Sequence, residues 1–354
     1  MRRRAKSAMR CAMVPAIFGL SGLTLSADER AFFRDADPAG YILFGRNVES
    51  RDQVRRLTDE LRALHGRDRT FICIDQEGGR VARMKPPHWR AYPPGAVFDR
   101  LWDTAPASAI EAARANAHAL GLDLAEAGIS VDCLPLLDVR DPLGHDVIGD
   151  RAYGAEPLRV AALGRATIDG LALAGVAGVV KHMPGHGRAG ADSHKALPTV
   201  TATAEELERD LAPFRTLNHA SIAMTAHVLF TAWDADNPAT LSPYVIGEVI
   251  RRQIGFDGLL LTDDLDMEAL SGTVPERAAR AIAAGCDIAL NCWAKMDDMV
   301  GIAKALPTMS GKTAERLDYA LSGTASFAEP VDLSAQGERL ALRDRLLDLL
   351  KDRA

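Results

Sequence analysis

The segment KHMPGHGRAGADSHKALPTV, residues 181–200, gathers side chains that can bind metals or transfer protons. It holds three of the nine histidines of the chain, His182, His186 and His194, with Asp192 among them. All four side chains are competent metal ligands, yet their spacing matches neither a helical HExxH pair nor an H-x-H at a strand end. A metal site is one interpretation, and a loop whose histidines only hydrogen-bond the backbone is another.

General acid/base catalysis requires fewer groups from this segment than a metal site does. Only Ser193 separates Asp192 from His194, so a turn lets the carboxylate accept from one imidazole nitrogen while the other nitrogen faces a substrate. Such a carboxylate fixes the tautomer of an imidazole and favours its protonated form. Glycines would let the loop move when substrate binds. The glycines of this loop are Gly185, Gly187 and Gly190.

The run LLLTDDLDM, residues 259–267, supplies a partner for an acid/base loop. A carboxylate at a strand end can attack an anomeric carbon or act as a base. One of Asp263 and Asp264 is expected only to cap the next helix. Strand alternation puts the two on opposite faces, and periodicity does not tell which one faces a pocket.

Eight short apolar runs predict the strands that position these groups. Their hydrophobicity is continuous rather than alternating, which is typical of strands buried on both faces of a parallel sheet. The runs are PAIFGL (15–20), GYILFG (40–45), TFICID (70–75), ISVDCLP (129–135), GVAGVVKH (175–182), SIAMTAHV (221–228), GLLLTDDL (258–265) and CDIALNC (286–292).

Helix signals fill most of the segments between these runs. Capping pairs occur at Ser50 with Gln53 and at Thr203 with Glu206. The alternation predicts an α/β fold, a (β/α)8 TIM barrel, with a doubly wound open sheet as the weaker alternative. We expect residues 13–354 to form one catalytic domain with C-terminal helices packed on the barrel. Residues 1–12 are expected to form a short flexible extension.

Polar residues recur where the expected strands end. In such a barrel the catalytic groups lie at the carboxyl ends of the strands, so these side chains are expected to converge. Single charges at such positions often only cap the following helix. The strand-end residues are Asp75, Asp132, Lys181, His182, His227, Asp263, Asp264 and Asn291.

Composition narrows the class of partner. The net charge is −6 with no basic stripe, which argues against nucleic acid and for a small or neutral ligand. The five cysteines form no CxxC pair, so we expect reduced thiols in a cytoplasmic protein. No stretch beyond the N-terminus approaches the roughly eighteen apolar residues of a membrane span.

The N-terminus has two interpretations. MRRRAKSAMR followed by CAMVPAIFGLSGLTLS has the basic and apolar regions of a secretory signal. Against this, Leu25 stands where cleavage after Ala27 needs a small residue, and SADE at 26–29 is a helix capping box. The apolar run before this box therefore also has the pattern of a first barrel strand, and the family resemblance described below favours the strand for residues 13–25.

Four motifs together resemble a known family. KHMPGHGRAGADSH, DQEGGRVAR, VIGDRAYG and LLLTDDLDM are similar to those of the bacterial β-N-acetylglucosaminidases of glycoside hydrolase family 3, single-domain enzymes of peptidoglycan recycling. The resemblance covers about residues 13 to 300 in the same order. Met183 replaces an aromatic residue and Thr262 replaces a serine, and neither departure touches the chemistry.

The resemblance implies a role for each matched residue. It makes Asp263 the nucleophile and His194 the general acid/base, with Asp192 polarising that histidine. It also implies a set of substrate-binding residues, which are Asp75, Arg83, Arg151, Lys181 and His182.

The activity implied is retaining, exo-acting removal of terminal β-linked GlcNAc from peptidoglycan fragments. The substrate would be GlcNAc-1,6-anhydro-MurNAc, with or without peptide, and the mechanism a double displacement without metal or cofactor. We expect a cytoplasmic monomer with no nucleic-acid or membrane partner. The alternatives are a β-GlcNAc phosphorylase on the same scaffold, a metal-dependent barrel hydrolase and a non-catalytic muropeptide-binding protein. Water is preferred to phosphate because the loop carries only Arg188 and Lys195 as further cations.

Overall fold

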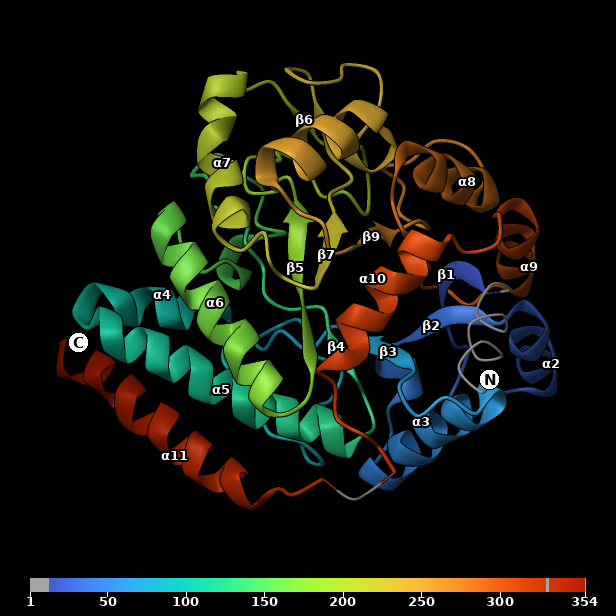
Figure 1. Ribbon diagram of the computed structural model, residues 1–354. Coiled ribbons are helices and arrows are strands. Elements are labelled where there is room, and N and C mark those ends of the chain that lie inside the picture. The colour runs from blue at the N-terminus through green and yellow to red at the C-terminus, as the bar shows by residue number, and fades with distance from the viewer. Residues whose placement is uncertain (1–12, 329–330, 354) are drawn as a thin grey trace, which may run out of the picture.

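Eight parallel strands close into a barrel with helices around it (Figure 1). The computed structural model describes residues 13–328 and 331–353, so the expected N-terminal extension lies outside the described residues. The (β/α)8 barrel is confirmed, and all eight predicted strands are present. Around the barrel their order is β1, β10, β9, β7, β5, β4, β3 and β2. Their bounds are β1 Val14–Gly19, β2 Pro38–Leu43, β3 Phe71–Ile74, β4 Val131–Asp132, β5 Ala177–Met183, β7 Ile222–Thr225, β9 Leu259–Asp264 and β10 Ile288–Asn291.

The first strand closes the barrel. Within β1, Phe18 pairs with Tyr41 of β2 on one side and with Asn291 of β10 on the other. The apolar run 13–25 therefore contains a barrel strand, as its sequence predicts. Without this strand, β2 and β10 would each lose a row of backbone hydrogen bonds.

Ten α-helices are described, and the capping signals noted in the sequence correctly mark the starts of three of them. Ser50 caps α3 through Gln53, and Ser26 and Thr203 form capping boxes for α2 and α7. The bounds are α2 Ala27–Ala36, α3 Arg51–His65, α4 Gly95–Thr104, α5 Pro106–Glu126, α6 Pro157–Leu173, α7 Ala204–Thr216, α8 Val274–Ala284, α9 Met296–Ala305, α10 Gly311–Ser322 and α11 Ser334–Leu347.

Several shorter elements complete the chain, and a small sheet among them was not predicted. This sheet pairs β6, Thr199–Val200, with β8, Leu229–Phe230, in the connections that follow β5 and β7. The remaining elements are the 3₁₀ turns η2 Gly45–Asn47, η3 Gly149–Arg151, η4 Ala239–Leu241 and η6 Asp348–Arg353, and the π-helical segment η5 Val245–Ile254.

The end of the chain returns to the barrel wall. Helix α11 lies along α5 (Figure 1), where Arg343 Nη1 donates to Asn116 Oδ1 at 3.1 Å and Gln336 Nε2 donates to the Ala119 carbonyl at 3.1 Å. No helix in residues 13–328 and 331–353 is long and apolar enough to cross a membrane.

The hydrophobic core of the protein has two layers. One apolar cluster fills the barrel interior with side chains such as Ile17, Ile42 and Val179, and a larger one packs the helices against the strands. The four described cysteines are buried and unpaired by disulfides. In barrels of this kind the interior is packed with side chains, and ligands bind at the carboxyl ends of the strands.

Candidate active site

A cavity of about 400 Å³ opens at the carboxyl ends of the strands. All eight residues that the resemblance singles out line it, although they come from five separate segments. They are Asp75, Arg83, Arg151, Lys181, His182, Asp192, His194 and Asp263. The strand-end residues Asp132, His227 and Asn291 are not among the lining residues.

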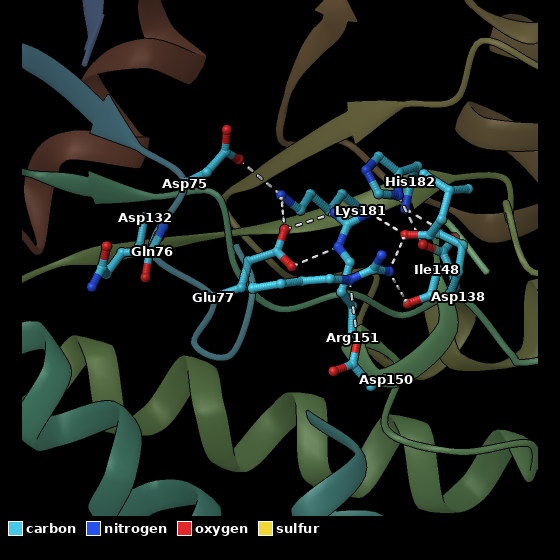
Figure 2. A network of polar contacts seen from close by, with 12 residues as sticks. Asp75, Gln76, Glu77, Asp132, Asp138, Ile148, Asp150, Arg151, Lys181 and His182 are labelled. Carbon is cyan, nitrogen blue, oxygen red and sulfur yellow. Dashed lines mark hydrogen bonds and ion pairs between the residues drawn. The ribbon is translucent and has the colours of Figure 1, made fainter. Parts of the chain in front are cut away.

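Lys181 is buried at the base of the cavity and lies between Asp75 and Glu77 (Figure 2). Lys181 belongs to β5, and only 2% of its side chain is exposed. Its Nζ lies 3.0 Å from Asp75 Oδ1 and 2.7 Å from Glu77 Oε1. Arg83 Nη2 donates to the other oxygen of Asp75 at 3.1 Å. Burial raises the pKa of Asp75, but the charges of Lys181 and Arg83 outweigh it and hold that pKa well below its usual range.

Glu77 completes this floor and was missed from the sequence. Arg151 donates two hydrogen bonds of 2.7 Å to Glu77, one from Nε to Oε2 and one from Nη2 to Oε1 (Figure 2). Burial raises the pKa of Glu77, yet Arg151 and Lys181 bring the pKa below its usual value. The available signal was position, because Glu77 stands two residues after Asp75 in the DQEGG turn.

The charges of this cluster nearly cancel. Arg83, Arg151 and Lys181 bring three positive charges, and Asp75 and Glu77 bring two negative ones, so one positive charge is left over. Alternating donors and acceptors of this kind suit the hydroxyl and amide groups of a neutral polar ligand.

Asp263 and Asp264 differ in environment at the end of β9. Asp263 Oδ1 accepts from the backbone N–H of Asp264 at 2.8 Å. Burial raises the pKa of Asp263, but the histidines His182 and His227 lower it below the usual value, so the carboxylate is charged. Asp264 instead accepts from the backbone N–H groups of Asp266 and Cys292, and burial together with the Asp266 charge raises its pKa to about 8.

The predicted turn between Asp192 and His194 is present. Asp192 Oδ1 lies 2.8 Å from His194 Nδ1 and also accepts the backbone N–H of His194 at 3.0 Å. Burial raises the pKa of Asp192, but these two hydrogen bonds bring it below its usual value. Because the ionised carboxylate only accepts, Nδ1 carries a proton, and Nε2 is left for the cavity. The His194 side chain is 64% exposed, which places it at the mouth.

The loop that carries this turn is docked on its neighbours. The Ala189 carbonyl accepts from His145 N at 2.8 Å, and the Ser193 carbonyl accepts from Ala269 N at 3.2 Å. A Cβ on Gly187 would overlap the Val139 carbonyl oxygen. Gly187 therefore permits a close approach of the two chain segments, and the expectation that it provides movement stays a prediction.

Two further buried residues lie beside the loop: Asp138, which the sequence analysis missed, and His186, which it considered only as a metal ligand or a backbone-bonding histidine. Asp138 is fully buried and contacts both His182 and the backbone of His186. His186 lines the cavity, and its Nε2 lies 3.3 Å from Ser193 Oγ. Burial, and then the nearby charge of His182, lowers the pKa of His186 to about 4. An aspartate directly after the apolar run LPLL was the one available signal for Asp138.

The described part of the chain contains no preformed cluster of metal ligands. No group of three or more His, Cys, Asp or Glu side chains among residues 13–328 and 331–353 is arranged to hold a metal ion. In particular, the Nδ1 atoms of His182 and His194 both face carboxylates of the protein.

A parallel barrel with charged side chains converging at the carboxyl ends of its strands defines the class of barrel enzymes that act on small polar substrates. The family follows from comparison with known proteins. Residues 12–322 match the family model described as "Glycosyl hydrolase family 3 N terminal domain". The chain belongs to glycosyl hydrolase family 3.

Named relatives cover most of this chain. It is similar to a protein named beta-hexosaminidase from Alkalilimnicola ehrlichii, 41% identical over 78% of this chain and 80% of the relative. A beta-hexosaminidase from Aromatoleum aromaticum is 34% identical over 96% of both chains. The crystal structure of NagZ from Neisseria gonorrhoeae in complex with N-trifluoroacetyl-D-glucosamine matches with a TM-score of 0.86 and 32% identity. That match covers 96% of this chain and 99% of the other.

Proposed function

We propose that the protein is a retaining exo-β-N-acetylglucosaminidase that releases terminal β-linked GlcNAc from peptidoglycan fragments. The observation that carries this proposal is the meeting of a charged Asp263 and an Asp192–His194 pair in one cavity with a sugar-sized cluster of donors and acceptors. The beta-hexosaminidase names of the relatives support the class of substrate.

In the first step, a carboxylate oxygen of Asp263 attacks the anomeric carbon. The bond to the leaving oxygen breaks, and His194 gives that oxygen the proton from Nε2. Asp192 holds the proton on Nδ1 and stabilises the doubly protonated ring before the transfer. The products of this step are the free aglycone and a glycosyl ester on Asp263.

In the second step, water replaces Asp263 at the anomeric carbon. Nε2 of His194, now without a proton, accepts one from the water as the oxygen attacks. The ester bond to Asp263 breaks, and the β configuration is restored by the second inversion. The enzyme returns to its starting protonation.

Five side chains are proposed to hold the terminal sugar. Each offers hydrogen bonds to hydroxyl or N-acetyl groups, and contacts that strengthen in the oxocarbenium-like state lower the barrier. The five are Asp75, Arg83, Arg151, Lys181 and His182. The N-trifluoroacetyl-D-glucosamine bound to the gonococcal structure supports an N-acylated glucosamine as the ligand.

The leaving group and the acceptor of the sugar are proposed from the residues around the opening of the cavity. The His194 side chain is 64% exposed, so the leaving group that it protonates would extend toward solvent, which suits an anhydro-MurNAc with or without peptide. We favour water as the acceptor, because Arg188 is already paired with Asp210 at 2.7 Å and with Asp141 at 3.4 Å. All proposed groups come from one chain, which suits a monomer, and recycling of such fragments suits the cytoplasm.

The test is an assay of the purified protein on an aryl β-GlcNAc and on GlcNAc-1,6-anhydro-MurNAc, with and without EDTA. We expect release of GlcNAc from both that EDTA does not change. Binding without turnover would contradict catalysis, loss of activity with EDTA would indicate a metal enzyme, and GlcNAc-1-phosphate as main product in phosphate buffer would indicate a phosphorylase.

A further inference from the structure

Asp138 lies beneath the cavity with no exposed surface, and both of its oxygens are occupied. Oδ2 lies 2.8 Å from His182 Nδ1 (Figure 2). Oδ1 accepts the backbone N–H of His182 at 3.2 Å and that of His186 at 2.7 Å. One carboxylate therefore contacts a cavity-lining ring and the first turn of the loop that leads to His194.

We propose that Asp138 is a positioning residue that fixes the tautomer of His182 and anchors the base of the loop carrying His194. The inference rests on the proposed function for what His182 binds. It concerns the ring itself and the backbone beneath it, so it can also be tested without turnover.

The tautomer follows from hydrogen-bond chemistry. Burial raises the pKa of Asp138, but His182 and then His186 lower it to about 2, so the carboxylate is ionised and can only accept. Nδ1 of His182 must therefore carry a proton. In the neutral ring Nε2 is bare, and it faces the cavity as an acceptor for a sugar hydroxyl.

The other oxygen of Asp138, Oδ1, holds the backbone at the start of the loop that carries His194. The N–H groups of His182 and His186 are buried, and both end on Oδ1. From there, His186 reaches Ser193, the residue between Asp192 and His194, through Nε2 and Oγ at 3.3 Å. The position of the acid/base pair is thus linked to Asp138 through His186, by one contact of 2.7 Å and one of 3.3 Å.

Asp138→Asn separates the two roles. The amide oxygen can replace Oδ1 and keep both backbone hydrogen bonds, while the amide NH₂ at the Oδ2 position donates to Nδ1. The proton of His182 would then move to Nε2, which turns an acceptor in the cavity into a donor. Asp138→Ala removes both roles.

The matched control is Asp132→Asn. Asp132 is another fully buried aspartate, at the end of β4, and its Oδ1 accepts the backbone N–H of Gln76 at 3.0 Å. Burial raises the pKa of Asp132 well above its usual value. Asp132 is not among the residues that line the cavity, and an amide keeps the acceptor for Gln76 N, so activity should stay as in the wild type.

The experiment is a long-range ¹H–¹⁵N correlation on protein labelled with ¹⁵N-histidine, at a pH well above the ordinary imidazole pKa of about 6.5. His182→Gln identifies the signal by its loss. We expect a protonated Nδ1 and a bare Nε2 in the wild type and in Asp132→Asn, and the reverse in Asp138→Asn. A proton on Nε2 of His182 in the wild type overturns the proposal, whether or not the enzyme turns over.

Kinetics on an aryl β-GlcNAc give the second readout. Asp138→Asn should raise KM and lower kcat/KM by about 10- to 100-fold, because a sugar hydroxyl would meet a donor in place of an acceptor. A lower kcat at unchanged KM that matches the loss of folded enzyme would contradict positioning. Asp138→Ala should melt below Asp138→Asn, and equal melting of the two would refute the loop anchor. A wild type inactive on GlcNAc substrates would refute the proposed function and leave the tautomer result intact.

Discussion

Replacing Glu77 by glutamine removes one charge from the cavity floor and keeps the size of the side chain. Three contacts of 2.7 Å end on this carboxylate, one from Lys181 and two from Arg151. Loss of one partner of a buried ion pair costs about 3–5 kcal/mol. The glutamine keeps one acceptor oxygen, so we expect the lower end, a fall of about 3 kcal/mol in the free energy of unfolding.

The pH dependence of this loss has a defined sign. The pKa of Glu77 is lowered in the folded protein, so its stabilisation is complete above the unfolded glutamate pKa of about 4.3. As the pH falls through the lower pKa of the folded state, that stabilisation disappears. The difference in stability between wild type and Glu77→Gln should therefore be full at pH 7 and shrink in acid.

Thermal melting by calorimetry measures both effects. At about 2 °C per kcal/mol for a chain of this size, Glu77→Gln should melt about 6 °C below wild type at pH 7. The control is Glu248→Gln, which breaks an ion pair with Arg252, whose side chain is 69% exposed, and should cost less than about 1 kcal/mol. Equal melting of Glu77→Gln and wild type, or an equal loss in the control, would refute the reasoning.

Three further outcomes are expected. His194→Ala should slow hydrolysis of the natural disaccharide by about 10²–10⁴-fold and hurt an activated aryl glycoside far less, and equal losses on both would mean that the loop only binds. Asp192→Ala should show the same pattern in milder form, which parallel kcat measurements on the two substrates decide. Gly187→Ala should cost about 1–3 kcal/mol and lower kcat/KM, because its Cβ meets the Val139 carbonyl. Gly190→Ala has open space and should behave as wild type, so a shared effect would contradict the packing argument.

The barrel was predictable because its signals are local. Each strand is a continuous apolar run, and capping residues such as Ser50 and Thr203 mark helix starts within a few positions. The strand-end residues could be placed at one face for the same reason. The additional β6–β8 sheet joins two short segments in separate connections, and no periodicity of that length predicts a strand.

The supporting residues of the site were not predictable because their partners are distant in sequence. Glu77 lies 74 positions from Arg151, and Asp138 lies 44 positions from His182. Only closure of the barrel brings these pairs together. The close contact of Gly187 was missed for a related reason, since its neighbour Val139 belongs to another loop.

The central claim is that Asp263 forms a covalent glycosyl ester with His194 as its acid/base partner. The most direct measurement is mass spectrometry of peptides after trapping the enzyme with a fluorinated GlcNAc analogue, which slows hydrolysis of the ester. We expect the added sugar on Asp263, and no labelled peptide from Asp263→Ala, whose turnover should fall by several orders of magnitude. A label on Asp264, or no label in an enzyme that the analogue inactivates, would contradict the account.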